Sequence, residues 1–494
     1  MKLSELFGRA GLAYSPNLGE IEIERIVSDS RKVTPGDMYI AIRGLHVDGH
    51  DKINEAICKG ATVIVAEQVR DVFVGGAATV FVENTRVTMA LLYDAWYGCP
   101  SRSLRIVGVT GTNGKTSVSW LLSSLFDRLG YRTGLVGTVE CRSLGRRLEI
   151  RCGGEDANMT TPDPEALYAM LAQMVHDGVE FVFMEVTSHA LSLGKCDAIE
   201  FDMALFTNLS RDHLDFHGTM EAYLEAKKKL FRRCRRAVIN VDDAAGRQIL
   251  DEMTLTAKTC SVTGMADYTA SNIKNETIGV LSYTLGTPTG SYPISVPLMG
   301  DFALFNTLMA ASVACEYGME PQKVCSALRQ IEGVPGRMEC VASEEQSGFS
   351  VLIDYAHTPD ALEKLLKSVR KIPHTGRILL VFGCGGDRDR GKRREMAQIA
   401  TRLADFVIIT SDNSRGENPE QIFSDILRGI DKEKPYTLIR DRKEAIEYAI
   451  DTARKGDILL LAGKGHETYE INKTGRHPFD EREIVRKALE KHRP

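Results

Sequence analysis

The sequence predicts an α/β protein of three domains, for three reasons. The chain has 494 residues, which is more than one ordinary core holds, since a domain usually contains roughly 100 to 200 residues. Short apolar runs typical of buried parallel strands alternate with helical patterns. Turn-rich segments interrupt this alternation at 98–103 and 332–339. We therefore expect domains at 1–100, 101–335 and 336–494.

The expected strands of the first two domains are short and apolar. In the first domain they lie at 37–42, 62–67 and 79–83, and a helix-like stretch lies at 52–60. In the second domain they have the continuously apolar character of buried strands, at 105–109, 180–186, 203–207 and 236–240. We expect the first domain to be a small α/β unit and the second to contain a parallel sheet.

The third domain has a regular feature at the ends of its expected strands. Apolar runs at 350–355, 377–383, 405–410 and 457–463 are each followed by a polar, glycine-rich or charged tip. These tips read DYAHTPD, GCGGDRDRGKR, SDNSRGENP and GKGHE. Ligands of open parallel sheets bind beyond the carboxyl ends of the strands, so these tips predict a binding site.

Composition excludes several classes of function. The net charge of −5 gives no global reason to expect nucleic-acid binding. In the basic stretch 226–236, Leu230, Phe231 and Cys234 form an apolar stripe, so we expect most of its lysines and arginines to form a solvated face. Eleven cysteines without metal-ligand spacing indicate reduced thiols. With no signal peptide and no apolar run near 18 residues, we expect a soluble cytoplasmic protein without membrane insertion.

The stretch 108-GVTGTNGKTS-117 has the character of a phosphate-binding loop. An apolar strand ends, small residues turn the chain, and a helix is expected to start near Thr116. Backbone N–H groups at a helix start can hold phosphate, Lys115 supplies a cation, and the Thr116 hydroxyl can bind magnesium. The spacing is unusual, because the common pattern has a glycine where Val109 stands. The alternative is a plain strand-to-helix turn, which the strand-loop-helix context disfavours.

Two further side chains in this domain follow apolar strands. Glu185 closes a buried strand, where a carboxylate is costly unless a cation or hydrogen bonds compensate it. His213 lies in a polar loop after another strand. Taken singly, each residue could be a capping acid or an ordinary loop histidine. Together with the phosphate loop, they favour a metal-phosphate site.

These motifs and several others together resemble the Mur ligases, which are ATP-dependent amide ligases of peptidoglycan precursor synthesis. The resemblance rests on GTNGKT, MEVTSHAL, NLSRDHLDFHG, AKKKLF, GRME, DYAHTPD and GKGHE, in this order along the chain. Within the family, the segments at 29–50, 160–164 and 411–419 are similar to the UDP-N-acetylmuramoyl-tripeptide synthetases. The family's own loop is GT-x-GK-T/S, which accounts for the unusual spacing.

The resemblance implies a fold and a reaction. A uridine-binding first domain would precede a central P-loop-type ATPase domain and a Rossmann-like third domain that takes the amino acid. ATP would phosphorylate the carboxylate of UDP-MurNAc-L-Ala-D-Glu, and an amino acid's amine would attack the acyl phosphate. Such chemistry needs phosphoryl clamps and placing of two reactants rather than a protein nucleophile. We expect a monomer whose domains approach one another when ATP binds.

The resemblance also implies residue roles at the ATP end. Lys115, Lys227 and His213 would be catalytic. The ligands of two Mg²⁺ ions would be Thr116, Glu185, His213 and Lys227. Lys227 would carry a carbamate formed with CO2, the alternative being a plain surface cation. The ATP contacts would be Gly111, Thr112, Asn113, Gly114, Lys115, Thr116, Asn306, Arg337, Asp354 and His357. One departure is Ala303, where the family usually has an asparagine.

The UDP-sugar substrate would meet a further set of residues. These are Ser28, Ser30, Leu45, His46, Val47, Thr160, Thr161, Thr187 and Lys195. The family commonly has an arginine in place of Lys195. Lysine keeps the charge but loses the planar fork of donors.

The added amino acid would be selected by the third domain. Diaminopimelate has a second carboxylate that lysine lacks, so its site needs a cation, for which an arginine fork is well suited. The diaminopimelate type of the family carries Asp-Asn-Pro-Arg, and this chain has Asp412, Asn413, Ser414 and Arg415. Further contacts would be Arg388, Gly463 and Glu467, with Glu467 receiving an ammonium group. We expect meso-diaminopimelate; L-lysine, with Arg415 a solvated loop residue, is the alternative.

Two other functions were compared with this expectation. Another ligase of this fold, such as a folylpolyglutamate synthase, is disfavoured by the match of the first domain and by the DNSR tip. A noncatalytic ATP-binding module would be expected to lose Lys115, Glu185, His213 or Lys227, and all four are present.

Overall fold

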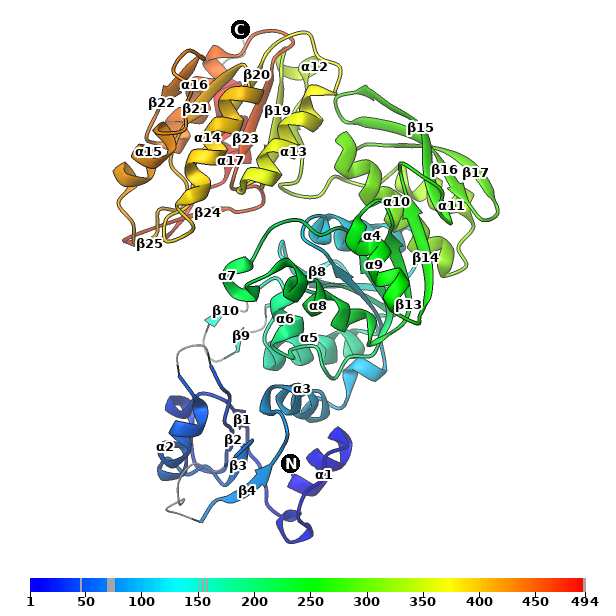
Figure 1. Ribbon diagram of the computed structural model, residues 1–494, viewed down its shortest axis with the longest axis vertical. Helices are drawn as coiled ribbons and strands as arrows, with labels where there is room; N and C mark the ends of the chain where they lie inside the picture. Colours follow the sequence, from blue (N-terminus) through cyan, green and yellow to red (C-terminus); the bar gives the residue numbers. More distant parts are fainter. Residues whose placement is uncertain (45–46, 69–75, 150, 153–154, 157–158, 492–494) are drawn as a thin grey trace. The chain divides into compact units, whose positions relative to one another are not determined.

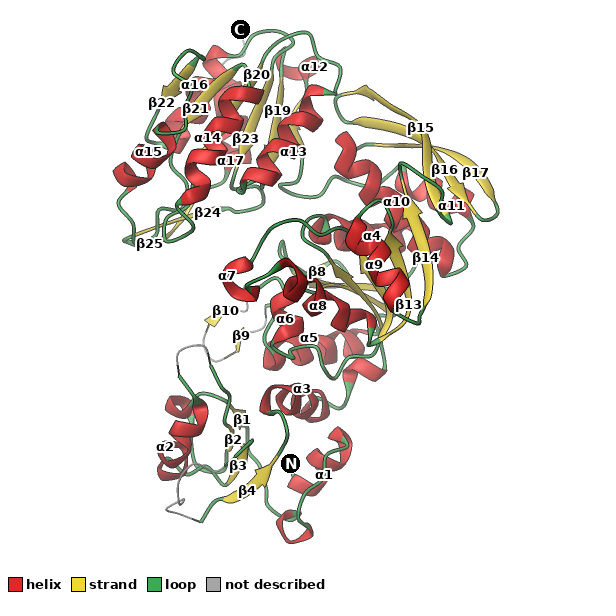
Figure 2. Ribbon diagram, viewed as in Figure 1, coloured by secondary structure: helices red, strands yellow, loops and turns green. Residues whose placement is uncertain are grey.

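The computed structural model describes residues 1–44, 47–68, 76–149, 151–152, 155–156 and 159–491. The contacts divide the chain into two units, Met1–Cys260 and Ser261–Pro494, and each is described here by itself. Figure 1 follows the chain through both units, and Figure 2 distinguishes their helices from their strands. The division falls inside the second expected domain, and the two boundaries between the three expected domains remain a prediction.

The first unit begins with a small parallel sheet. Its order is β1-β2-β3-β4, formed by Ile26–Val27, Met38–Ile40, Val63–Ala66 and Ala78–Phe81. Three of these strands lie at the expected positions, and every residue of β3 is buried. The accompanying α-helices are α1 (Leu3–Ala10), α2 (Ile53–Cys58) and α3 (Thr85–Trp96). This part is the small α/β unit that the sequence predicts.

The rest of the first unit is built on a second parallel sheet. The central strand, β5 (Arg105–Thr110), lies between β11 (Phe181–Glu185) and β12 (Phe201–Phe206). Parallel strands continue outward as β6 (Thr133–Val136) beside β11, and as β13 (Cys234–Asn240) and β14 (Thr256–Ser261) beyond β12. β5 and β11 run parallel with Glu185 opposite Val109, so their carboxyl ends bring residues 110–116 and 185–187 to one edge of the sheet.

Helices and short strands complete this unit. The helices are α4 (Lys115–Arg128), α5 (Pro164–Asp177), α6 (Ser188–Ser192), α7 (Leu214–His217), α8 (Met220–Phe231) and α9 (Ala244–Glu252). Two antiparallel strands, β7 (Cys141–Ser143) and β8 (Arg146–Arg147), extend the sheet beyond β6. β9 (Arg151–Cys152) and β10 (Glu155–Asp156) form a separate antiparallel pair. α4 starts directly after the phosphate loop, as the sequence predicts.

The second unit begins with three antiparallel strands that the sequence analysis did not identify. They are β15 (Tyr268–Thr277), β16 (Val280–Thr287) and β17 (Gly290–Val296). Burial alternates along β16, which is the pattern of a strand with one covered face. Two helices follow, α10 (Gly300–Glu316) and α11 (Pro321–Leu328).

The second unit ends in a six-stranded sheet with the order β18-β19-β23-β20-β21-β22. β18 (Glu339–Ala342) is antiparallel to β19 (Ser350–Asp354). The others are parallel: β20 (Ile378–Phe382), β21 (Phe406–Ile409), β22 (Tyr436–Leu438) and β23 (Ile458–Ala462). The four strands expected in the third domain are therefore confirmed.

Helices cover both faces of this sheet. One core includes residues of α13 (Pro359–Arg370), α14 (Gly391–Leu403) and α15 (Pro419–Leu427), and the other residues of α16 (Arg442–Thr452) and α17 (Glu481–Lys491). A short α12 (Glu344–Ser347) and a hairpin of β24 (Tyr469–Asn472) and β25 (Gly475–Pro478) complete the unit. The α/β fold class with a Rossmann-like final part is confirmed.

The cysteines and the apolar character of the helices bear on the expectation of reduced thiols and of no membrane insertion. Ten cysteines have side chains that the structure describes, and these are free thiols. Among the described helices, none has both the length and the apolar character needed to cross a bilayer.

Candidate active site

The phosphate loop connects β5 to α4 and depends on two glycines. Gly111 has a φ of 151°, and a Cβ there would lie 1.8 Å from the Thr207 hydroxyl oxygen. Gly114 has a φ of 87° and is the N-cap residue of α4. Since Gly114 has no side chain to cap the helix, the first N–H groups of α4 can serve a ligand instead. This geometry suits a phosphate group.

A neighbouring strand tip holds the loop through hydrogen bonds. The backbone N–H of Thr112 donates to the Asn208 carbonyl at 2.8 Å, and that of Asn113 donates to the Asn208 side-chain oxygen at 2.9 Å. The Thr207 hydroxyl donates to the Asn113 carbonyl at 2.7 Å. The sequence analysis gave neither Thr207 nor Asn208 a role, although Asn208 stands in the quoted NLSRDH motif. Both residues fix the shape of the loop.

Lys115 folds back over the loop from the first turn of α4. Its ammonium donates to the carbonyl of Gly111 at 3.0 Å and to that of Thr112 at 2.8 Å. The positive charge therefore lies against the loop in which phosphate is expected.

Glu185 and Thr116, two of the predicted metal ligands, lie together. The Thr116 hydroxyl donates to Glu185 Oε2 at 2.9 Å, and both side chains are buried. Thr138 donates its backbone N–H to Glu185 Oε1 at 2.7 Å and its hydroxyl to Oε2 at 3.1 Å. Carboxylate and hydroxyl oxygens are the ligands that Mg²⁺ prefers, so this donor set fits the ion. Thr138, which follows β6, was missed by the sequence analysis.

Lys227 is one of the most deeply buried charged residues of the first unit. Its side chain is only about 1% exposed, its ammonium donates to the Gly111 carbonyl at 2.8 Å, and it lies 4.3 Å from the centre of the Tyr223 ring. Burial, followed by the nearby Lys115 charge, lowers the pKa of Lys227 well below 10.5. The alternative of a plain surface cation is therefore wrong. Lys228 is also buried, and it pairs with Glu225 and Glu252. It is therefore not part of the solvated face that the sequence predicts for the stretch 226–236.

His213 precedes α7 in a left-handed backbone conformation, with a φ of 53°. Its ring centre lies 4.8 Å from that of His189 and 6.2 Å from that of Tyr223, the ring that Lys227 also faces. Burial lowers the pKa of His213, which favours the neutral ring that binds metals. Within the part of the chain that the structure describes, no three His, Cys, Asp or Glu side chains group as metal ligands.

The predicted UDP-sugar contacts fall into two places. Ser28, Ser30 and Val47 belong to the small sheet's part of the chain, where Ser30 is buried and Val47 is 57% exposed. Leu45 and His46 lie outside the described residues. The remaining predicted contacts, Thr160, Thr161, Thr187 and Lys195, belong to the larger sheet's part.

Three of these threonines belong to the hydrogen-bonded groups around Glu185 and Thr138. The hydroxyl oxygens of Thr138 and Thr160 lie 3.0 Å apart. The Thr161 hydroxyl donates to the Glu185 carbonyl at 2.9 Å and lies 3.2 Å from the Thr187 hydroxyl. Lys195 pairs with Asp163 at 2.8 Å, within the TTPDP motif. This part of the predicted substrate site therefore borders the predicted metal site.

In the second unit, three predicted ATP contacts lie around the tip of β19. Asp354 accepts the backbone N–H groups of Met338 and Ala356, each at 2.8 Å, and burial raises its pKa. The Arg337 guanidinium lies 4.6 Å from the centre of the Tyr355 ring, and His357 Nδ1 lies 2.9 Å from the Tyr355 carbonyl. Asn306 lies on α10 and is buried.

The predicted amino-acid contacts gather at the tips of β21 and β23. The Asn413 amide donates to Glu467 Oε2 at 2.8 Å, and the buried Lys464 donates to Asn413 Oδ1 at 3.2 Å. Gly463 has a φ of 117°, and a Cβ there would lie 2.7 Å from Asp412 Oδ2. Burial raises the pKa of Glu467. Lys464 stands inside the quoted GKGHE tip, but the sequence analysis assigned it no role.

Arg415 lies beside this cluster in a left-handed conformation, with a φ of 50°. Its Nη1 donates to the Gly386 carbonyl at 2.9 Å, so the arginine joins the tip of β21 to the loop after β20. Ser414 is buried, while Arg388, in the loop after β20, is exposed. The structure thus brings most of these predicted residues into neighbouring loops.

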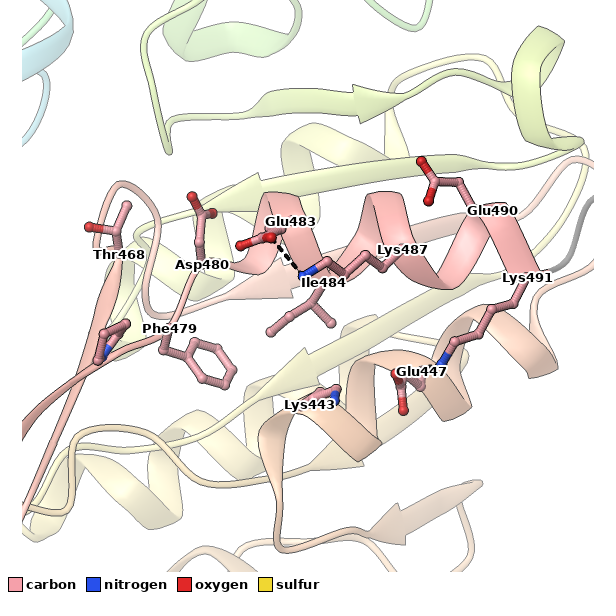
Figure 3. Close-up of a pocket in the computed structure, with 11 residues that line it drawn as sticks. Lys443, Glu447, Thr468, Phe479, Asp480, Glu483, Ile484, Lys487, Glu490 and Lys491 are labelled. Atoms are coloured by element: carbon pink, nitrogen blue, oxygen red, sulfur yellow. Dashed lines mark hydrogen bonds and ion pairs between the residues drawn. The ribbon is translucent and has the colours of Figure 1, made fainter.

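A groove of about 610 Å³ elsewhere in the second unit contains none of the predicted residues. It is lined by α16, α17 and the segment that precedes α17, as Figure 3 shows. Its charges include the ion pairs Glu483–Lys487 at 2.6 Å and Glu447–Lys491 at 3.4 Å. The groove adjoins the amino-acid loops, since Thr468 follows Glu467 and the Phe479 ring centre lies 5.4 Å from the Lys464 ammonium.

The fold and the loop define a P-loop-type α/β protein joined to a Rossmann-like part. Three family models match the chain: "Mur ligase family, catalytic domain" at 22–90, "Mur ligase middle domain" at 109–314 and "Mur ligase, glutamate ligase domain" at 336–465. The chain belongs to the Mur ligase family.

Full-length relatives agree with this assignment. The UDP-N-acetylmuramoyl-L-alanyl-D-glutamate–2,6-diaminopimelate ligase of Geobacillus kaustophilus is 41% identical, with 99% of each chain covered. The protein of the same name from Clostridioides difficile is 40% identical, with 99% of this chain and all of the other covered. A solved structure of a ligase with that name is 32% identical over the whole of both chains, with a TM-score of 0.72. The resemblance drawn from the motifs is confirmed.

Proposed function

We propose that this chain is the ATP-dependent ligase that adds meso-2,6-diaminopimelate to UDP-MurNAc-L-Ala-D-Glu. The observation that carries the choice of amino acid is the position of Arg415 beside the contact between Asn413 and Glu467. A cation next to a carboxylate can receive a substrate that has both acidic and amino groups at one end. The names of the full-length relatives support the same choice over L-lysine.

The ATP end of the proposed reaction lies at the phosphate loop. The N–H groups at the start of α4 and the Lys115 ammonium would hold the phosphates. Thr116 and Glu185 would hold Mg²⁺, which neutralises charge on the transferred phosphoryl group. The carboxylate of the dipeptide substrate would attack the γ-phosphate, releasing ADP and leaving an acyl phosphate. No side chain needs to act as a nucleophile.

The environment of Lys227 supports the predicted carbamate. A lysine whose pKa is lowered is more often a neutral amine, and the neutral form is the nucleophile. Its nitrogen would bond to the carbon of CO2 and lose a proton, giving an anionic carbamate. That anion and His213, which face the same tyrosine ring, would complete the ligands of a second Mg²⁺ ion.

The loops that carry Arg415 and Glu467 would bind the amino acid for the second step of the reaction. Arg415 would bind the distal carboxylate of diaminopimelate, and Glu467 would accept a hydrogen bond from an ammonium group. The free amine would then attack the acyl phosphate carbon, and the tetrahedral intermediate would expel phosphate. We further propose that the enzyme acts as a cytoplasmic monomer on these small molecules.

Phosphate release tests the proposal. The purified protein, with ATP, Mg²⁺ and UDP-MurNAc-L-Ala-D-Glu, is expected to release phosphate when meso-diaminopimelate is added and far less with L-lysine. Mass spectrometry should identify the tripeptide product. If neither amino acid caused phosphate release, the ligase would be refuted, while release with lysine alone would refute the choice of diaminopimelate.

A further inference from the structure

A buried arginine in the second unit contacts two acidic residues that precede and follow the start of α15. Arg393, in the first turn of α14, is fully buried. Its Nη1 and Nη2 donate to the two carboxylate oxygens of Glu417 at 2.9 and 2.7 Å, and Nη1 also donates to Asp425 at 3.0 Å. Such a two-pronged pair fixes orientation as well as distance.

This ion pair joins the two loops that carry the amino-acid residues. Arg393 Nη2 donates to the carbonyl of Gly385 at 3.3 Å, and the Asp387 N–H donates to Glu417 Oε2 at 3.1 Å. Both Gly385 and Asp387 belong to the loop after β20. Glu417 belongs to the loop after β21, two residues beyond Arg415. The pair therefore ties the loops together on either side of Gly386.

The same two loops make three further contacts around Arg415. The Gly386 N–H donates to the Asn413 carbonyl at 2.9 Å, Arg415 Nη1 donates to the Gly386 carbonyl at 2.9 Å, and the Gly416 N–H donates to Asp387 Oδ2 at 2.8 Å. Arg415 and Asp387 both have left-handed backbones, with φ of 50° and 51°. Such conformations persist in residues other than glycine only when the surroundings enforce them.

The charge of the pair is stable over the usual assay range. The Arg393 guanidinium lowers the pKa of Glu417 to about 2. The exposed Arg390 adds a second contact, at 3.0 Å from Glu417 Oε1. A neutral Glu417 is therefore not expected at any pH at which the enzyme is assayed.

We propose that Arg393 and Glu417 are positioning residues that hold Arg415 where it meets the second carboxylate of the amino-acid substrate. This inference rests on the proposed function. Neither residue needs to touch the substrate, because Glu417 acts by fixing the loop that carries Arg415. The chain has Ser414 in place of the more rigid proline, so the ion pair supplies a restraint on the loop that the backbone alone does not.

The test is a comparison of E417Q with E420Q. Glutamine keeps the shape of Glu417 but removes its charge. Glu420 is the matched control, since it lies on α15 and pairs with the exposed Arg440 at 2.6 Å. E417Q is expected to raise the KM for meso-diaminopimelate about tenfold, because small misplacements of binding groups have effects of this size or larger. The kcat and the KM for ATP should change less than about twofold, and E420Q should resemble the wild type.

A double-mutant cycle separates positioning from general destabilisation. If Glu417 acts through Arg415, E417Q should raise the KM about tenfold in the wild type but less than about twofold in R415A. An equal increase in both backgrounds would overturn the inference.

A second variant decides the matter if E417Q does not fold. Asp387 is exposed and links the same loops through the Gly416 N–H, so D387A is expected to fold. It should raise the KM for diaminopimelate about threefold, which is the size expected for the loss of one hydrogen bond, and leave the KM for ATP unchanged. An unchanged KM for diaminopimelate in D387A and in any folded E417Q, with the wild type active on that substrate, would overturn the inference. An inactive wild type would instead refute the proposed function.

Discussion

The phosphate loop of the first unit and the amino-acid loops of the second are stabilised in different ways. The loop at 111–116 is held by backbone N–H and carbonyl groups, with Asn208 and Thr207 as its partners. The loops around Arg415 are held by charges, chiefly the buried pair of Arg393 and Glu417. A loop held by its backbone groups can be recognised from a short local motif that is rich in small residues. A loop held by charges depends on residues that are distant in the sequence.

The largest effect is expected from K115A, at the backbone-held loop. Removing the ammonium should lower phosphate release about a thousandfold, since a lost electrostatic contact to a reacting group typically costs this much. The matched control is K229A, an exposed lysine on α8. A decrease of less than about tenfold would show that the loop's N–H groups suffice without the lysine.

A smaller effect is expected from R415A, at the loops held by charges. Hydrogen bonds to charged groups contribute about 1.5 to 3 kcal/mol, so the KM for meso-diaminopimelate should rise roughly tenfold to a hundredfold. The KM for ATP should stay the same. R440A, which removes a surface arginine of the same unit, should leave both constants unchanged. An unaltered KM in R415A would remove this arginine from recognition of the second carboxylate.

A stability effect is expected from G463A. Alanine would adopt a φ of 117° and place its Cβ 2.7 Å from Asp412, so the free energy of unfolding should fall by about 1 to 3 kcal/mol. G475A is the matched control, because Gly475 has a φ of 122° but no atom near its Cβ. Denaturant unfolding should therefore show a smaller loss for G475A. Equal losses would assign the whole effect to backbone strain rather than to Asp412.

The smallest effect is expected in the pH dependence of stability at Lys227. In the unfolded chain this lysine keeps its proton up to about pH 10.5, whereas the folded protein releases it at a lower pH. Between those two values the unfolded state binds more protons, so the free energy of unfolding should rise with pH. Below the lowered pKa the cost of burying the charge is fully present.

K227M tests this dependence in CO2-free buffer. Its advantage in stability over the wild type should shrink as the pH rises from 7 towards 10, measured by denaturant unfolding. K229M, at an exposed lysine of the same helix, should show no such trend. A constant difference between K227M and the wild type would contradict a lowered pKa.

Much of the parallel sheet structure could be predicted from the sequence, because buried parallel strands are continuous apolar runs. The strands β19, β20, β21 and β23 each appear at the expected position, with polar tips after them. The antiparallel strands β15 to β17 were missed, since they are not continuously apolar and the second half of β15 is largely exposed. Alternation along β16 was the available signal.

The site was only partly predictable, for a related reason. The burial of Lys227 could have been found, because residues 227, 230 and 231 share one face of α8 at i, i+3 and i+4. Thr138 follows β6, which lies beside the expected strand β11, and Lys464 follows the expected strand β23. A single polar residue after a strand does not reveal which side chains it will contact. Arg393 and Glu417 are separated by 24 residues, and only the three-dimensional structure brings them together.

The contacts of Lys115 have a thermodynamic consequence for nucleotide recognition. Its ammonium donates to two loop carbonyls, so a phosphate group that takes one of those two N–H groups exchanges a hydrogen bond rather than adding one. The heat released by that exchange should be small. Displaced water would then provide the driving force at this position, and the contribution of the Lys115 contact to nucleotide affinity should vary only weakly with temperature.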